Sequence, residues 1–403
     1  MDLLIHKSVL GTAQHLMTNP EDATIQWRTD IPAYAWVVGE DSHPNSIEAL
    51  IHVLGEKPID LFPRAHIQAF EEICPDGMCS DIPWRWILSD DQYMDRLNMI
   101  IEKSRINVCA LEDSNYDQTY KTIRKFLLSL SQPLINVDRL NGYIKANDKG
   151  MTVEASLRSF LPKGSRAHKI VYDQAGTATG RLTVKSGPRI LTLPSRYRDI
   201  IKPDPGCEVV QIDLVSAEPR TALYVAGKQA EGDVYSTIAQ DLGLDVERDV
   251  VKVASLSALY GAGSSSLSNL LGSKVLAKRV IERLRDHFGV RRVESQLLSD
   301  MKSHGFITNL FGRKLMTRPD EIQKGYSHFM QSTTSDAAIS MFSVACNLMA
   351  QQDENFKPYY LIHDALVCQM SSSKRKGLQA LTSRLELEGV GFYETKMTSI
   401  SDN

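Results

Sequence analysis

The sequence has no apolar run that approaches the about 20 residues needed to cross a bilayer. Its N-terminus, MDLLIHKSVLGTAQHLM, lacks the basic start and the long apolar stretch of a secretory signal. Internal repeats, low-complexity segments and coiled-coil heptads are absent as well. We therefore expect a soluble, cytoplasmic protein made of ordinary packed domains, with no membrane partner.

Neither the cysteines nor the net charge indicates a metal site or a nucleic-acid partner. The six cysteines are scattered, and Cys74 and Cys79 are too far apart for a zinc pair with two intervening residues. We expect them to be reduced thiols without a metal role. The net charge of −3 excludes a protein coated in basic residues. If a nucleic acid binds, its basic groove must be local.

The remaining composition is ordinary for a globular protein, with 42% hydrophobic and 24% charged residues. A chain of 403 residues is long enough for two or three domains. Residues 1–114 hold short apolar stretches broken by Pro, Asp and Gly, which predict a small mixed α/β region of unknown function. From Tyr116 to about Leu161, apolar residues recur at three- and four-residue spacing and predict helices.

Two strand patterns each carry an acidic residue at the end of an apolar run. Glu208 to Asp213 reads as a strand that ends in Asp213, and Tyr359 to Val367 has a His-Asp pair where a turn would fall. Helical patterns extend from the first strand through Leu284, which gives a mixed α/β layout. Carboxylates on adjacent strands can converge on one cation. Alternatively, Asp213 caps the next helix and Asp364 only shapes a turn.

A helix is predicted from Arg248 to Tyr260, with Gly261 as its terminator. Four side chains recur every four residues and share one face: Arg248, Lys252, Leu256 and Tyr260. Two cations one turn apart suit a triphosphate, because they can neutralise adjacent phosphoryl groups. The alternative is a solvated basic face that pairs with nearby acids such as Glu247 and Asp249.

Two of these patterns resemble segments of the family A DNA polymerases, the bacterial polymerase I type. In that family an Asp is followed five residues later by Glu and seven later by Arg, which Asp213, Glu218 and Arg220 match. The helix that begins at Arg248 is similar to the fingers helix of the family, at its full spacing through Tyr260 and Gly261.

Further segments in the family's order strengthen the resemblance. LIHDALV resembles the palm hairpin, with His363 and Asp364 as its His-Asp pair. Upstream, TATGRL (177–182) and PRILTLP (188–194) are similar to the primer-contacting stretch, while GFITNLFGRKL (305–315) and MQSTTSDA (330–337) resemble two more. Departures from the family pattern fall at Gln323, Ser327, Leu256 and Ala365.

The resemblance implies a polymerase right hand, with palm, fingers and thumb, in which the palm is built on a small antiparallel sheet. The expected regions are 1–114, of unknown function; 115–165, thumb-like helices; 166–230, palm with the primer-contacting segment and the first catalytic strand; 231–300, fingers; and 301–403, palm with the second catalytic hairpin.

The implied reaction is the addition of deoxynucleotides to the primer of a primed DNA template. Two magnesium ions, for which manganese can substitute, are expected at Asp213 and Asp364, because hard oxygen ligands suit them. Lys252 is the further catalytic residue. The expected nucleotide contacts are Arg248, Lys252, Tyr260, Glu218, Leu256 and Tyr235. The expected DNA contacts are Arg181, Thr179, Gln331, His363 and Arg313.

Other functions stay open at this point. A single-subunit RNA polymerase shares the two aspartates and the fingers helix, although Glu218 and TATGRL favour DNA synthesis. A catalytically inactive DNA-binding scaffold and a metal-dependent nuclease are two further alternatives. Residues 1–114 contain no strand with the Asp-x-Glu pattern of an editing nuclease, so we expect no proofreading. We expect a replication enzyme that a phage or plasmid encodes in a bacterial host. Its accessory proteins are not identified by the sequence.

Overall fold

The computed structural model describes residues 3–7, 14–19, 24–32, 36–38, 89–92, 95, 116–146, 150–162, 164–174, 176–244, 246–260, 265–315 and 322–400. Of the six cysteines, Cys207, Cys346 and Cys368 are free thiols, as predicted. The other three lie outside the described residues: Cys74, Cys79 and Cys109.

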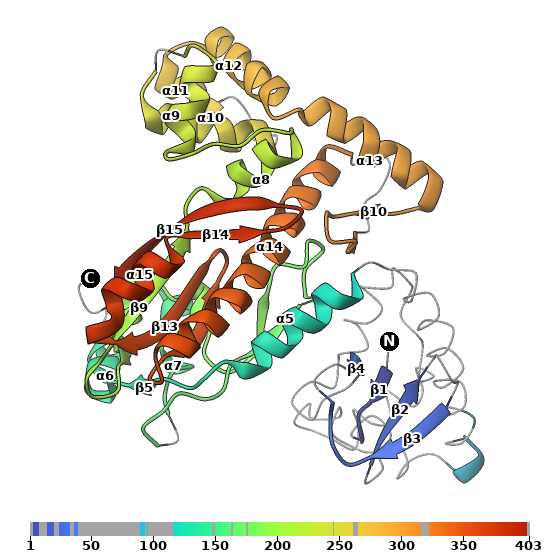
Figure 1. The fold of residues 1–403 in the computed structure, drawn as a ribbon, viewed down its shortest axis with the longest axis vertical. Helices are drawn as coiled ribbons and strands as arrows, with labels where there is room; N and C mark the ends of the chain where they lie inside the picture. Colours follow the sequence, from blue (N-terminus) through green and yellow to red (C-terminus); the bar gives the residue numbers. More distant parts are fainter. Residues whose placement is uncertain are drawn as a thin grey trace.

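The first described elements form a small sheet, drawn in blue in Figure 1. Its strands are β1 (Leu3–Ile5), β2 (His15–Asn19), β3 (Thr24–Arg28) and β4 (Trp36–Val38). Their order is β3-β2-β1-β4, in which β1 pairs antiparallel with β2 and parallel with β4. The sequence assigned this region no function, and its role stays open.

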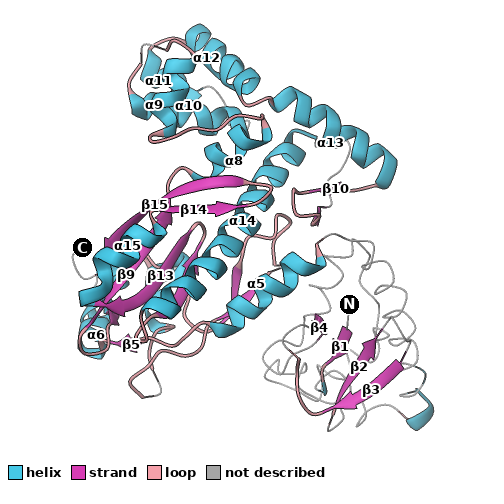
Figure 2. Cartoon of the chain, viewed as in Figure 1, coloured by secondary structure: helices cyan, strands magenta, loops and turns pink. Residues whose placement is uncertain are grey.

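A five-stranded antiparallel sheet lies at the centre of the molecule (Figure 2). In spatial order its strands are β12 (Lys357–Ile362), β13 (Ala365–Ser371), β9 (Cys207–Leu214), β15 (Gly391–Ser399) and β14 (Arg384–Leu387). Six of the seven residues of β13 are buried, because both faces of the sheet are covered there. Both predicted strands, and the turn between β12 and β13, are therefore confirmed.

Helices and short strands around this sheet share one hydrophobic core with it. The helices are α5 (Asp117–Ser129), α6 (Val137–Lys145), α7 (Met151–Arg158) and α15 (Arg375–Thr382), and the first three confirm the predicted helical segment. The short elements are β5 (Leu134–Ile135), β6 (Val171–Asp173), β7 (Thr183–Ser186), β8 (Ile201–Lys202) and the 3₁₀ helices η3 (Ile190–Thr192) and η4 (Ser195–Ile200). A further 3₁₀ helix, η6 (Ser372–Lys374), precedes α15 and has no buried residue. Whether α5 to α7 act as a thumb stays a prediction.

A second hydrophobic core is helical and reaches from Ala222 to Met330. It is formed mainly by α8 (Ala217–Val225), α9 (Val234–Asp241), α10 (Arg248–Tyr260), α11 (Ser265–Leu271), α12 (Lys274–His287) and α13 (Val290–His304). The short strands β10 (Ile307–Thr308) and β11 (Lys314–Leu315) pair beside it. The helix predicted from Arg248 to Tyr260 is confirmed, whereas Gly261 lies outside the described residues.

The 31-residue helix α14 (Ile322–Gln352) joins the two cores. Tyr326 to Met330 pack in the helical core, and Ala337 to Met349 pack in the core of the central sheet. At 1.5 Å per residue the helix is about 46 Å long, enough to span both units. Among the described residues, no helix combines the length and the apolar character needed to cross a membrane.

Candidate active site

Two carboxylates meet at one end of the central sheet. Asp213 is the penultimate residue of β9, and Asp364 lies in the turn that joins β12 to β13. In the β9–β13 ladder Asp213 is the register partner of Ala365, the residue after Asp364. The backbone N–H of Leu214 also donates to the Asp364 carbonyl at 3.0 Å. The predicted convergence of the two acids on adjacent strands is therefore present.

Two unusual backbone conformations lie next to these aspartates. Ser216 and His363 are the non-glycine residues of the described chain with positive φ, at 54° and 55°. Such left-handed conformations cluster at functional sites, where the surrounding structure enforces them. Ser216, and not Asp213, is the N-cap residue of α8, and it makes no side-chain capping bond. The helix-cap alternative for Asp213 is therefore wrong.

Burial raises the pKa of both aspartates. For Asp213, the burial effect outweighs a hydrogen bond from Gln211 and the charges of Arg198 and Lys396, which favour the ionised form. For Asp364, burial acts together with the negative charges of Glu218 and Asp213. Carboxylates that are buried close to like charges are poised to accept a cation, because a cation would offset both effects.

A cavity of about 340 Å³ lies between Asp364 and α10. Glu218 and Asp364 line one part of it, while Arg248, Lys252 and Leu256 line another. These three α10 residues lie on one helical face, as the four-residue spacing predicted. A negatively charged ligand such as a polyphosphate could therefore bind to the cationic helix while its bound cation faces the aspartates.

The two cations of α10 differ in their partners. Arg248 forms a bidentate ion pair with Asp233, with Nη2 2.6 Å from Oδ1, and lies over the ring of Tyr235 at 5.2 Å. Its hydrogen bonds are the main reason why the pKa of Asp233 falls to about 2. Lys252 is exposed and makes no ion pair or hydrogen bond with the residues that the structure describes. Lys252 is thus available to a ligand, whereas Arg248 must exchange a partner.

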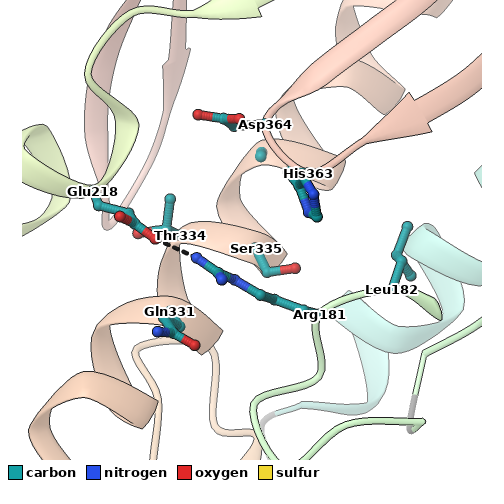
Figure 3. A pocket seen from close by; sticks show the side chains of 9 residues that line it. Arg181, Leu182, Glu218, Gln331, Thr334, Ser335, His363 and Asp364 are labelled. Carbon is teal, nitrogen blue, oxygen red and sulfur yellow. Dashed lines mark hydrogen bonds and ion pairs between the residues drawn. The ribbon is translucent and has the colours of Figure 1, made fainter. Parts of the chain in front are cut away.

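A second cavity, of about 260 Å³, adjoins the first and shares Glu218 and Asp364 with it. Figure 3 shows the Arg181 side chain extending across this space to form an ion pair with Glu218. Around the pair lie His363 from the hairpin turn and residues of α14, among them Gln331. Glu218, a predicted nucleotide contact, therefore pairs with Arg181, a predicted DNA contact.

Tyr260 and Arg220 differ in their relation to Glu218. The Tyr260 hydroxyl is buried, and burial raises its pKa most, while the charge of Glu218 and a hydrogen bond with it raise the pKa further. Arg220 is buried and donates to the carbonyls of Val215, Ala230 and Gly232. Arg220 thus holds the start of α8 in place instead of neutralising Glu218.

Arg313 and Thr179, predicted to contact DNA, lie inside the protein. Arg313 is 3% exposed and forms a two-bond ion pair with Asp336, at 2.8 and 3.0 Å. Its third donor reaches the Gln174 carbonyl at 2.9 Å. Thr179 is 7% exposed. Because buried side chains cannot reach a bound duplex without rearrangement, the structure does not support these two contacts.

Gly180 shows how the buried Arg313 supports the loop that carries Arg181. A Cβ added at Gly180, whose φ is +71°, would lie 2.3 Å from the Arg313 guanidinium. The loop that carries Arg181 therefore packs directly on Arg313 and requires glycine at this position. The glycine of the TATGRL segment has a structural cause that the motif alone did not reveal.

The structure shows where the departures from the family pattern lie, and it adds two contacts that were not predicted from the sequence. Ala365 is buried in β13, Ser327 donates to the Lys324 carbonyl, and the side chain of Gln323 lies outside the described residues. Asp233, the N-cap of α9, was missed as the partner of Arg248, although its position before a helical pattern is a recognisable capping signal. Gln211 was also missed, despite lying two residues before Asp213 on the same strand face.

The donor set fits a divalent metal only with help from a ligand. The described residues contain no group of three or more His, Cys, Asp and Glu side chains placed to hold a metal ion. Asp213 and Asp364 instead offer two oxygen-donor groups at one end of the sheet, and Asp364 lines the cavity. Magnesium keeps several waters and commonly takes further oxygens from a substrate phosphate, so two carboxylates suffice for it. Fold and geometry thus place two carboxylates at one end of the sheet and a cationic helix face across the cavity from Asp364.

Comparison with known proteins identifies the family. The sequence profile of DNA polymerase family A matches residues 95–389, well over half of the chain. The chain therefore belongs to DNA polymerase family A.

Individual relatives are more distant and longer. The chain is 29% identical over 175 residues to DNA polymerase I of Chloroflexus aurantiacus, which covers 38% of this chain and 18% of that protein. It is 26% identical over 235 residues to the DNA polymerase of Mycobacterium phage D29, which covers 53% and 37%, respectively. Against DNA polymerase I of Deinococcus radiodurans it is 28% identical over 257 residues, covering 56% and 26%. The matches thus span between a fifth and two fifths of these relatives.

A solved structure is also similar. It is the POL domain of Pol1 from M. smegmatis in complex with DNA primer-template and dNTP, with 17% sequence identity and a TM-score of 0.46. The match covers 89% of this chain and 64% of that chain.

Proposed function

We propose that this chain is a template-directed DNA polymerase that adds deoxynucleotides to the 3′ end of a primer. Membership of DNA polymerase family A supports the reaction class. The observation that carries the proposal is the placement of Asp213 and Asp364 at one end of the sheet, where Asp364 lines a cavity together with Arg248 and Lys252. A nuclease site would require the carboxylates but not this cationic helix.

Asp213 and Asp364 would hold two magnesium ions, with manganese as a substitute. When bound, such ions supply activation of the primer hydroxyl and neutralisation of charge on the phosphates. The protein's own contribution is to keep the two carboxylates together, ionised in the presence of the cations, on neighbouring strands. Their raised pKa values are the cost of that arrangement, because the charged forms are buried.

The α10 cations act on the other side of the nucleotide. Lys252, exposed in the cavity, would donate to oxygens near the α-phosphate, where negative charge develops, and would protonate the leaving pyrophosphate. Arg248 would move from Asp233 to the outer phosphates, with Tyr235 beneath it. Leu256 and Tyr260, further along the helix, would pack against the sugar and base.

The second cavity is the proposed primer side. Arg181, Gln331 and His363 line it beside Asp364, so a primer end bound there would lie next to the reacting phosphate. Arg181 would donate to minor-groove acceptors, which occupy similar positions in every correct base pair. To do so it must leave Glu218, whose carboxylate would then lie near the ribose of the nucleotide.

We further propose that the chain lacks proofreading. The four described strands of the N-terminal sheet contain no Asp or Glu, so they offer no carboxylate for a nuclease metal. An end-labelled primer with a mismatched 3′ terminus should therefore stay intact with magnesium and no nucleotides. Steady shortening of that label would show that the chain has a nuclease site.

Extension of a labelled primer on a DNA template tests the main proposal. We expect extension with the four deoxynucleotides and magnesium, none with a chelator, and little with ribonucleotides. A known DNA polymerase in parallel reactions controls for the substrates. No extension under any condition would favour an inactive DNA-binding scaffold. Synthesis that uses ribonucleotides and needs no primer would favour an RNA polymerase.

A further inference from the structure

The Asp213 carboxylate is the end of a short chain of hydrogen bonds. Its Oδ1 accepts from the Gln211 side-chain amide, Nε2, at 2.8 Å. The Gln211 Oε1 in turn accepts from the Arg198 guanidinium, Nη1, at 2.6 Å. Gln211 and Asp213 lie two residues apart on β9 and share a strand face, whereas Arg198 comes from η4.

The chemistry of the three side chains fixes which atom donates and which accepts in each of these hydrogen bonds. A guanidinium can only donate hydrogen bonds, so the oxygen of the Gln211 amide must face Arg198 and its nitrogen must face Asp213. No other hydrogen bond to the Asp213 carboxylate occurs within the described part of the chain. One oxygen is therefore held, while the second is available to a cation.

Arg198 is held in an unusual environment for its charge. It is half-buried, and burial lowers its pKa while the nearby charge of Asp213 raises it. Its Nε is buried without a partner among the described residues, and its remaining contact is a 3.5 Å bond to the Leu193 carbonyl. No carboxylate in the described chain forms an ion pair with it. A half-buried cation without an ion-pair partner lowers the free energy of unfolding. Stability alone therefore does not explain why Arg198 lies here.

An amide between the two charged groups has a specific chemical effect. A direct ion pair between Arg198 and Asp213 would neutralise the carboxylate and compete with a metal. The Gln211 amide is neutral, so it transmits the orientation set by Arg198 while leaving the negative charge in place. The terminal torsion of an aspartate is otherwise broad, so fixing it removes an ordering cost from metal binding.

We propose that Gln211 and Arg198 are positioning residues that orient Asp213 for a divalent cation. This inference rests on the proposed function, in which Asp213 holds one of the metal ions. It predicts that removing the Gln211 amide weakens metal binding about tenfold, the lower end of the range for groups that orient metal ligands. Replacing Arg198 by lysine keeps the charge but loses the planar donor that fixes the amide, so it should weaken binding by a smaller factor.

Manganese binding, measured by electron paramagnetic resonance, tests this without turnover. The probe is Mn²⁺ titrated into the full chain with a dideoxy-terminated primer-template and the next dNTP, so that no bond forms. The variants are Gln211→Leu, Arg198→Lys and Asp213→Ala. The matched control is Glu208→Leu on the opposite face of β9, which also removes a polar group held by an arginine, at 2.7 Å from Arg375. Thermal melting reports whether each variant is folded.

The expected order of Mn²⁺ affinity is wild type and Glu208→Leu, then Arg198→Lys, then Gln211→Leu, then Asp213→Ala. Wild-type affinity in both folded Gln211→Leu and Arg198→Lys, with weakened Asp213→Ala, would overturn the positioning role alone. Wild-type affinity in Asp213→Ala would instead overturn the metal site of the proposed function. If Gln211→Leu does not fold, the comparison of Arg198→Lys with Glu208→Leu decides the question.

Discussion

Asp204 and Asp213 lie near opposite ends of strand β9 and differ in their partners. Asp204 accepts hydrogen bonds from Lys357 at 2.5 Å, Arg166 at 2.8 Å and Gln369 at 3.1 Å. These donors, Lys357 foremost, hold its pKa at about 2. Asp213, at the other end, has one amide donor, and burial raises its pKa.

The contrast extends to two acids in the loops beside these ends of the sheet. Beside Asp204, Asp353 accepts three hydrogen bonds, from Ser371 and Asn355, and these lower its pKa despite burial. Beside Asp213, Asp364 is buried near the negative charges of Glu218 and Asp213, and its pKa is raised. One sheet thus has an end where carboxylates stabilise the fold and an end where they reduce stability. Unsatisfied charge of that kind is typical of a site that binds a cation or substrate.

The largest expected effect concerns the buried ion pair between Arg313 and Asp336, which stabilises the fold although it lies beside the site. Arg313→Met would leave Asp336, which is fully buried, without its cation. Loss of one partner of a buried pair costs about 3–5 kcal/mol, so the free energy of unfolding in urea should fall by that amount. Arg158→Met, which breaks an exposed pair with Glu154, is the control and should cost less than about 0.5 kcal/mol. Similar losses in both variants would contradict a structural role for Arg313.

Lys252 is expected to act on the substrate, because it has no ion-pair or hydrogen-bond partner in the described chain. Lys252→Ala should lower the rate of single-nucleotide insertion by about 10²–10³-fold, as expected when a donor to developing charge is lost. Its melting temperature should be unchanged. Lys278→Ala, an exposed lysine on α12, is the matched control and should insert at the wild-type rate. Equal rates in the two variants would remove Lys252 from the mechanism.

Glu218 connects the two cavities, so its removal should alter selectivity more than rate. Glu218→Ala opens space beside the ribose and frees Arg181 from its ion pair. The efficiency of ATP relative to dATP opposite template T should rise by about 10–200-fold, the range for a gap of about one methylene, or more if a polar contact is lost. Glu282→Ala, on the distant α12, should leave the ratio unchanged. An unchanged ratio in Glu218→Ala would reject its role in sugar selection.

The smallest expected effect is at Asp204. Because its pKa is lowered in the folded state, its contribution is present above the ordinary aspartate pKa and is lost as the pH falls towards 2. Asp204→Asn should lower the free energy of unfolding at pH 7 by about 1 kcal/mol, since its partners are partly exposed and screened. The difference from wild type should shrink between pH 5 and pH 3. A constant difference over that range would exclude the ionised pair as its cause.

Much of the fold could be predicted from the sequence, because local patterns decide it. Apolar runs predicted β9 and the hairpin, and the four-residue spacing predicted α10 from Arg248 to Tyr260. Strand ends that carry acids predicted that Asp213 and Asp364 would meet. The strand and helix predictions depend on residues within a few positions of one another, where backbone geometry leaves little choice.

The partners of the charged side chains could not be predicted, because they come from distant segments. Arg181 pairs with Glu218, 37 residues later, and Arg313 pairs with Asp336, 23 residues later. A motif shows which residue types recur but not whether a side chain is buried. For this reason Arg313 and Thr179 were predicted to contact DNA, although both are buried.

The insertion rate of Asp364→Asn tests the central claim most directly. We would measure single-turnover insertion of one nucleotide at saturating dNTP and magnesium for wild type, Asp364→Asn and the control Asp204→Asn. Asp364→Asn should lose at least about a thousandfold in rate while it remains folded, by comparison with the loss of other charge-stabilising groups. Asp204→Asn should retain the wild-type rate. A folded Asp364→Asn variant that inserts at close to the wild-type rate would contradict the assignment of this end of the sheet as the catalytic one.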